Sequence, residues 1–185
     1  MCKLLDGAFD FLHKKGYLAM TNQANKDEGL SDLVNKYLLM CGNCAQTSFI
    51  TLQETFDLED GGILKALTPL PGIALRGETC GAVIGSLMAL GLVFGRDRDQ
   101  LDDWSSYIRS LPSARRFCRN FEAVYGSTMC GDIVEKQFGR RFNLADPAES
   151  MEWLSERAIE KCGEVIASAV GIAAEIIKRK RKLTE

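Results

Sequence analysis

The stretch that decides the fold is TCGAVIGSLMALGLVF, residues 79–94. Thr79 is a residue type that caps helix starts, and residues 80–94 contain neither a charged side chain nor a proline. A helix without a polar face is buried on several sides. Residues 80–94 are therefore predicted to form the central helix of the molecule.

The rest of the chain also shows helical spacing of apolar residues. Gly61, Pro69 and Pro71 lie within a loop expected over about 57–77, and Pro112 is expected to end a helix. No segment alternates apolar and polar residues as a strand does. The fold class is therefore all-α, a compact multi-helix bundle around the buried central helix (about 80–94). The further helices are expected at 4–15, 32–40 after a Ser31 cap, 43–56 after an Asn43 cap, 104–111, 113–124, 130–138 and, as the long C-terminal helix, 150–180.

Length and charge restrict the class of protein. The 185 residues suit one helical domain over 1–185, with residues 1–30 as an N-terminal helical extension. Lysine and arginine total 23 against 25 aspartates and glutamates, so nucleic acid is not expected as a partner. The uncharged run, about Gly81 to Gly95, is too short to span a bilayer. Asp6 and Asp10 interrupt any signal-peptide core, so the expected compartment is the cytoplasm.

Seven cysteines are many for a chain expected to stay reduced. The first interpretation of any single cysteine is that it packs as a small hydrophobe. Cys44, Cys80 and Cys130, however, each fall in a predicted first helical turn, where unpaired backbone N–H groups and the helix dipole favour a thiolate. These thiols are expected to have lowered pKa values. Cys162 lies in mid-helix among apolar neighbours, where a thiol stays protonated unless another thiol or a metal contacts it.

This pattern resembles the C_GCAxxG_C_C family, described as redox-active proteins with four characteristic cysteines. Cys44 follows Asn43 as in the family's first motif, and the sequence CGAVIG, residues 80–85, fits the central signature. Residues 121–130 resemble the third cysteine segment, ending at Cys130, and Cys162 supplies the fourth cysteine. The resemblance covers about residues 35–178. It implies that Cys44, Cys80, Cys130 and Cys162 are the catalytic, cofactor-binding or metal-binding residues.

The glycines near Cys80 offer a way to gather distant cysteines. Gly81 and Gly85 at helical spacing, followed by Gly91, let neighbouring helices approach closely. Cys41 forms a CxxC with Cys44, but if Gly42 ends one helix and Asn43 caps the next, the two thiols need not be neighbours. The favoured interpretation is therefore that Cys41 has no functional role and that the CxxC spacing is incidental. Cys2 and Cys118 also fall outside the family positions and are expected to be ordinary cysteines.

Three functions remain open from the sequence. The four cysteines can cycle between dithiol and disulfide, with Cys80 as the first choice of attacking thiol, or they can bind zinc or an iron-sulfur cluster for electron transfer. The alternative is a non-catalytic helical interaction module with structural cysteines. The spacings exclude a compact ferredoxin or zinc-ribbon loop but not a site assembled between helices. Whether the protein is an oxidoreductase or an electron carrier is left undecided.

Cofactor and partner expectations follow from the resemblance. The family is also similar to part of the split-Soret cytochromes, which carry haem and an iron-sulfur centre. Haem is not expected here, because no CxxCH is present and the single histidine, His13, lies outside the resemblance. The expected partner is a redox protein or a small-molecule substrate, and homo-oligomers are left open.

Overall fold

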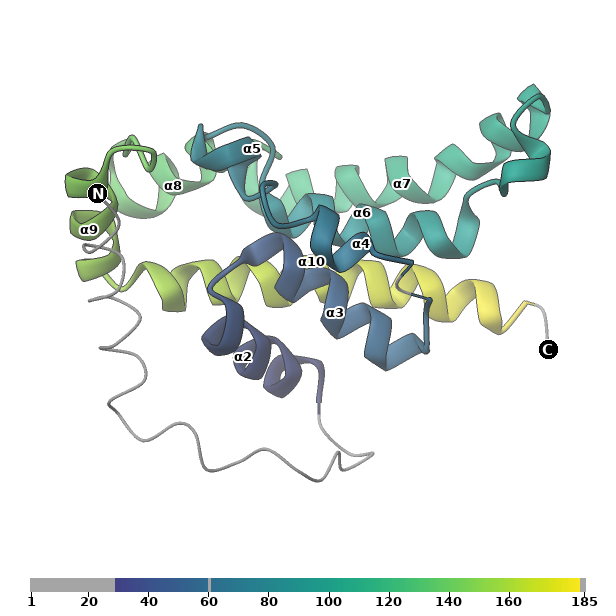
Figure 1. Ribbon diagram of the computed structural model, residues 1–185, viewed down its shortest axis with the longest axis horizontal. Coiled ribbons are helices and arrows are strands. Elements are labelled where there is room, and N and C mark those ends of the chain that lie inside the picture. Colours follow the sequence, from purple (N-terminus) through teal and green to yellow (C-terminus); the bar gives the residue numbers. More distant parts are fainter. Residues whose placement is uncertain (1–28, 60, 184–185) are drawn as a thin grey trace.

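The computed structural model describes residues 29–59 and 61–183, and this part of the chain is built from helices with no β-strand (Figure 1). The predicted all-α class is confirmed. The helix expected at 4–15, together with Cys2 and His13, lies outside the described residues. The described helices are α2 (Leu30–Cys41), α3 (Cys44–Phe56), α4 (Ile63–Ala66), α5 (Gly72–Leu75), α6 (Gly81–Phe94), α7 (Trp104–Tyr125), α8 (Cys130–Phe138), α9 (Pro147–Ser155) and α10 (Ala158–Arg181), with a 3₁₀ turn at Arg98–Gln100.

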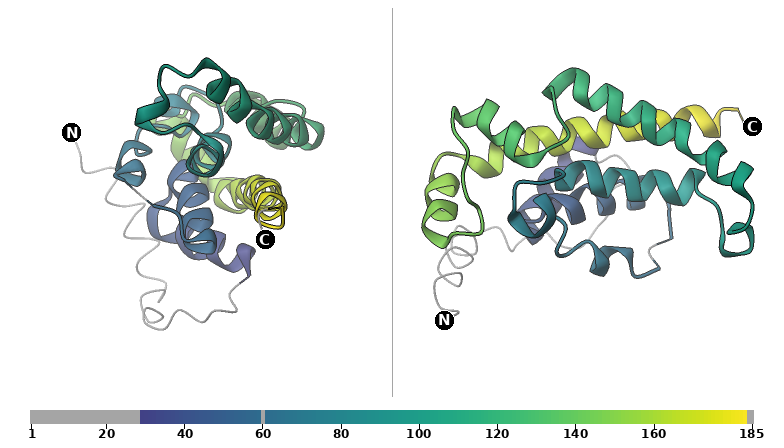
Figure 2. Two further views of the ribbon diagram at one scale, coloured as in Figure 1. Left: turned by 90° about the vertical axis from the view of Figure 1, so that its right-hand side faces the viewer. Right: turned by 90° about the horizontal axis from the view of Figure 1, so that it is seen from above.

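The bundle is organised by two helices, α6 and α10. Helix α6 packs against α3, α7 and α10, as the end-on view in Figure 2 shows. Helix α10 runs along the molecule and also contacts α2, α3 and α9 (Figure 1). The predicted central helix and long C-terminal helix are therefore both present. The core between these helices includes the fully buried side chains Phe49, Leu52, Val83, Phe117, Phe121 and Ile166. No helix in the described ranges has the length and hydropathy needed to cross a membrane.

Two glycines allow α6 to approach α3 without an intervening side chain. A Cβ atom at Gly85 would lie 2.1 Å from the carbonyl oxygen of Ala45. A Cβ atom at Gly81 would lie 2.4 Å from Sγ of Cys44. The close approach expected at these glycines is thus observed, and it sets the start of α6 against the start of α3. Gly91 is different, since nothing lies within 4 Å of a Cβ there. The expectation that Gly91 serves close packing was wrong.

The start of α3 is fixed by the turn at Gly42 and Asn43. Gly42 ends α2 in the left-handed conformation (φ 56°), and the Asn43 side chain accepts hydrogen bonds from the backbone N–H groups of Ala45 and Gln46. The predicted Asn43 cap is confirmed. The Asn43 amide also donates to the carbonyl of Thr68, at 3.1 Å. One residue therefore places Cys44 in the first turn of α3 and ties it to the loop before α5.

Replacing Asn43 by alanine is expected to lower the free energy of unfolding by about 1 kcal/mol, because the first N–H groups of α3 lose their acceptor. Urea unfolding followed by circular dichroism measures the change. Asn43→Asp is the matched control, since a carboxylate keeps the capping acceptor and loses only the donor to Thr68. Equal losses in the two variants would contradict the assignment of the cap.

Several predicted helix boundaries differ from the observed ones. Pro112 does not end a helix but lies inside α7, whose packing on α6 and α10 outweighs the roughly 3 kcal/mol that an internal proline costs. The helix expected at 150–180 is divided at Arg157, which adopts a left-handed conformation (φ 63°) between α9 and α10. The cap of α2 is Gly29 rather than Ser31, and the N-cap of α6 is Cys80 itself rather than Thr79.

Candidate four-cysteine site

The four cysteines singled out by the sequence meet at one cavity. Cysteines from α3, α8 and α10 and the N-cap cysteine of α6 border a space of about 30 Å³. Apolar side chains complete most of its wall. The lining residues are Cys44, Cys80, Ala82, Cys130, Ile133, Val134, Gln137, Cys162, Val165 and Ile166. All four cysteines are free thiols, so the space between them is bordered by unlinked sulfur atoms.

Three of these thiols stand where a helix begins. Cys44 is the first residue of α3, Cys80 is the N-cap of α6, and Cys130 is the first residue of α8. Cys162 comes instead from the second turn of α10. Three helix N-termini, with their unpaired N–H groups, therefore adjoin the same cavity. Negative charge placed in the cavity is favoured by this arrangement.

A short antiparallel pairing holds the starts of α6 and α8 together. Thr79 and Met129 form an isolated bridge. The backbone N–H of Cys80 donates to the carbonyl of Thr128 at 2.8 Å, and the N–H of Cys130 donates to the carbonyl of Glu78 at 2.7 Å. These bonds fix Cys80 and Cys130 side by side although 49 residues separate them. A single bridge has no sequence pattern of its own, so this contact was not predicted.

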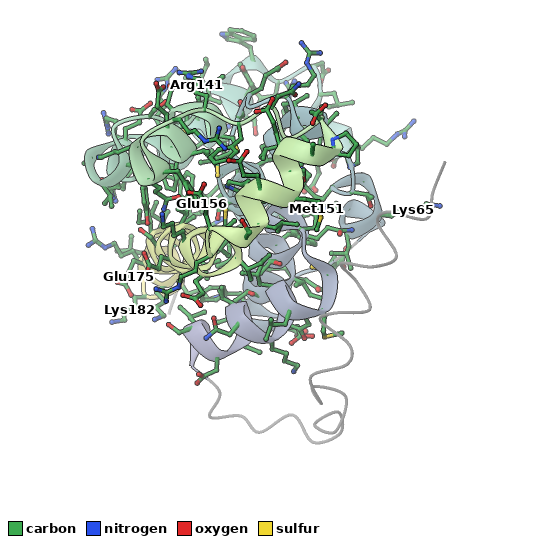
Figure 3. All side chains as sticks on the ribbon, turned by 90° about the vertical axis from the view of Figure 1, so that its left-hand side faces the viewer. Lys65, Arg141, Met151, Glu156, Glu175 and Lys182 are labelled. Atoms are coloured by element: carbon green, nitrogen blue, oxygen red, sulfur yellow. The ribbon has the colours of Figure 1, made fainter. Side chains whose placement is uncertain are left out.

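Polar contacts also fix the start of α8 from outside. The Ser127 hydroxyl accepts from the N–H of Met129 at 3.0 Å and donates to Asp132 at 2.7 Å. Arg141, labelled in Figure 3, pairs with Asp132 and with Glu135. Hydrogen bonds from Ser127 and Arg141 lower the pKa of Asp132, whose carboxylate is exposed. The loop after α8 thereby returns to the helix turn that carries Cys130.

Burial sets the ionisation of three of the thiols. It raises the pKa of Cys44 well above its usual value, and the neighbouring thiols of Cys80, Cys162 and Cys130 raise it further. Burial together with Cys80 raises the pKa of Cys130 to about 12. The pKa of Cys162 is raised in the same way, by burial first and then by Cys130 and Cys80. These raised pKa values favour the protonated form of the three thiols at neutral pH.

Cys80 shows both effects at once. Burial raises its pKa, while hydrogen bonding from the backbone of Ala82 and Val83 lowers it to a smaller extent. The helix-start stabilisation expected from the sequence is therefore present but is outweighed by desolvation. The expectation of lowered pKa values was wrong, because the sequence pattern does not reveal how completely α3, α8 and α10 enclose the thiols.

The remaining described cysteines lie elsewhere. The thiol of Cys41, at the end of α2, donates to the carbonyl of Tyr37 at 3.0 Å and lies 3.3 Å from the hydroxyl of Thr47. It does not border the cavity, which agrees with the incidental interpretation of the CxxC. Cys118 is half-buried on α7, where burial raises its pKa. Neither belongs to the group of four.

Gln137 is a cavity residue that the sequence did not indicate. Its side-chain amide donates to the carbonyl of Lys161 at 3.3 Å, while its Oε1 atom is buried and has no partner. Gln137 thus brings a polar acceptor into the lining of an otherwise apolar wall. A glutamine late in an amphipathic helix is typical of a solvated position, so no signal in the sequence marks it.

Within residues 29–59 and 61–183, no three His, Cys, Asp or Glu side chains already stand at the spacing of metal ligands. An ion bound in the cavity would require the thiol side chains to turn toward it. In a zinc site each zinc–thiolate bond would measure about 2.3 Å.

The fold and the site define an all-α protein that gathers four cysteines from helix starts and from its C-terminal helix around one cavity. A family model described as "Putative redox-active protein (C_GCAxxG_C_C)" matches residues 42–176. The chain belongs to this family, as the resemblance implied. No curated protein and no solved structure gives a significant match.

Proposed function

We propose that Cys44, Cys80, Cys130 and Cys162 are the thiolate ligands of a metal centre, an iron-sulfur cluster, that transfers electrons. The observation that carries the proposal is the meeting of these four thiols at one buried cavity. Four thiolates satisfy a small iron-sulfur cluster or a tetrahedral ion. The cluster, when bound, supplies reversible one-electron chemistry, and the protein supplies its ligands and surroundings.

The electrostatics of the cavity support an anionic centre. Four thiolates bring more negative charge than the metal neutralises, and the N-termini of α3, α6 and α8 lie where they offset the excess. The raised thiol pKa values describe the protein without a cation. A coordinated cation deprotonates a thiol outright, so the same burial that keeps the free thiols neutral favours the paired, metal-bound state.

The walls of the cavity support an inorganic group rather than an organic one. The space of about 30 Å³ exceeds what one water molecule needs but is far smaller than the usual pocket of an organic cofactor. Ala82, Ile133 and Val165 exclude solvent. Burial and the hydrogen bonds made to the ligands are the factors that adjust the reduction potential of such a centre.

Thiol and disulfide chemistry is the second candidate, and the shared cavity is the observation that favours it. Two neighbouring thiols would lose two electrons and two protons to a redox partner and form one disulfide. The raised pKa values count against it, because the thiolate is the attacking species. Cys80, the first choice of attacking thiol from sequence, is no exception.

Anaerobic purification followed by iron, zinc and sulfide analysis tests the proposal. We expect iron and acid-labile sulfide bound to the protein, with a visible absorption band that bleaches on one-electron reduction. A metal-free protein whose thiols titrate in a two-electron step would reject the metal centre in favour of the second candidate. A metal-free protein without any reversible thiol oxidation would reject both.

A further inference from the structure

The segment that lies against Cys130 has an unusual backbone. Gly72, Ile73, Ala74 and Leu75 have φ angles of 52°, 48°, 56° and 63°. Glycine adopts this left-handed region readily, whereas each other residue is strained there by contact between Cβ and the following carbonyl. Three non-glycine residues in succession, one of them β-branched, make α5 a strained left-handed turn.

This left-handed turn and the proline before it lie close to two of the four cysteines. A Cβ atom at Gly72 would lie 3.4 Å from Cβ and 3.5 Å from Sγ of Cys130. One residue earlier, Cα of Pro71 would lie 3.1 Å from a Cβ at Gly81, and that same Cβ would lie 2.4 Å from Sγ of Cys44. Figure 1 shows α5 beside the start of α8. Gly72 of the turn therefore lies against Cys130, and Pro71, which precedes the turn, lies near Cys44.

The turn is held by few contacts. Only Gly72 is buried, Ile73 is half-buried, and Ala74 and Leu75 are exposed. Its hydrogen bonds are short-range, such as those from the N–H of Ala74 to Pro69 and from the N–H of Leu75 to Pro71. Segments with little buried apolar area and exposed backbone hydrogen bonds open at low free-energy cost.

The other walls of the cavity cannot open so easily. Helices α3, α6 and α10 contribute fully buried side chains, including Phe49, Val83 and Ile166, to the main core. The start of α8 is bonded to the segment just after the turn, through the N–H of Gly131 and the carbonyl of Gly77. The turn, between Pro71 and the left-handed Gly77 (φ 77°), is therefore the weakly held segment beside Cys130.

We propose that the left-handed turn Gly72–Leu75 is a strained gate over the four-cysteine site, and that its local opening admits the group that binds Cys44 and Cys130. The identity of that group, a metal ion or cluster, rests on the proposed function, whereas the gate itself rests on the backbone geometry. The strain stored in Ile73, Ala74 and Leu75 favours opening. Closure then returns the bound centre to an environment shielded from solvent.

Ala74→Gly tests the gate because it relieves strain in the closed state without removing a buried side chain. Removing the strain of one left-handed alanine should shift the open–closed equilibrium roughly 5- to 30-fold toward the closed turn. Glycine also has more conformational freedom than alanine in the open turn, which should offset this shift by a few-fold. We expect alkylation of Cys44 and Cys130 by iodoacetamide to slow roughly 3- to 10-fold. The rates are read by peptide mass spectrometry on reduced, metal-stripped protein at one fixed pH.

Three further measurements accompany the test. Ala123→Gly makes the same substitution at an exposed position of α7 with ordinary helical geometry, and it should not slow alkylation. Ala74→Pro, whose ring fixes φ near −65°, should hold the turn open and accelerate alkylation of Cys44 and Cys130. Cys118, outside the cavity, is the internal reference and should keep its rate in every variant.

Unchanged or faster alkylation of Cys44 and Cys130 in Ala74→Gly would overturn the gate, as would a uniform change that includes Cys118. Because the protein is stripped of metal, these results do not depend on which group it binds. A protein that never binds metal can still show the gate, and a metal-binding protein can still lack it.

Discussion

Cys80→Ser is expected to remove the bound metal while leaving the helical fold intact. The four thiols share one cavity. Loss of a residue that hydrogen-bonds to a metal ligand weakens metal binding roughly 10- to 100-fold, so loss of a ligand itself should weaken binding more. Serine is also a preferred N-cap residue, so its hydroxyl can accept from the first N–H groups of α6. The variant therefore separates the chemistry of the site from the stability of the helix that carries it.

Metal content per chain and the visible spectrum, measured after anaerobic purification, report the result of this substitution. Cys118→Ser is the matched control, because Cys118 is a half-buried thiol outside the cavity. It should retain full metal content. Equal metal loss in the two variants, or full retention in Cys80→Ser, would remove the basis for a four-cysteine centre.

Gly85→Ala is expected to cause the largest loss of stability among single methyl additions in α6. The added Cβ would lie 2.1 Å from the carbonyl oxygen of Ala45, a backbone atom that cannot move aside without displacing α3. Overpacking of this kind costs typically 1–3 kcal/mol, and we expect the upper part of this range because the contact is with backbone. The displacement should also separate Cys80 from Cys44 and lower metal content.

The control is the same substitution in the same helix. Gly91→Ala places a Cβ where nothing lies within 4 Å, so it should raise the free energy of unfolding by about 0.5–1 kcal/mol through helix propensity. Urea unfolding of the two variants gives the comparison. A similar effect of both substitutions would show that α3 and α6 are not in close backbone contact.

Much of the fold was predictable because local sequence patterns indicate where helices start and which helices are buried. Residues 80–94 lack a polar face, and a helix of that kind has to be buried. Asn43 before an apolar stripe indicates a helix start, and the structure has the cap at that residue. The glycine spacing at Gly81 and Gly85 likewise predicted close packing around Cys80, and the closest neighbours of both positions are on α3.

What the sequence could not predict depends on contacts between distant segments. Pro112 is a helix breaker by local chemistry, yet tertiary packing keeps α7 continuous. Ile73 and Arg157 belong to residue types that rarely adopt positive φ, so their left-handed conformations contradict local preference. The prediction of lowered thiol pKa values was wrong for the same reason. The positions of Cys44 and Cys130 in first helical turns were predicted correctly, but the burial that outweighs the effect of a helix start arises only when α3, α6, α8 and α10 meet.

The central claim is that four sulfur atoms, distant in the chain, surround one metal centre. X-ray absorption spectroscopy at the metal edge of the anaerobically prepared protein measures this most directly. The account predicts a first coordination shell made of sulfur alone, at about 2.3 Å. A shell dominated by nitrogen or oxygen, or an unchanged sulfur shell after Cys80→Ser, would contradict it.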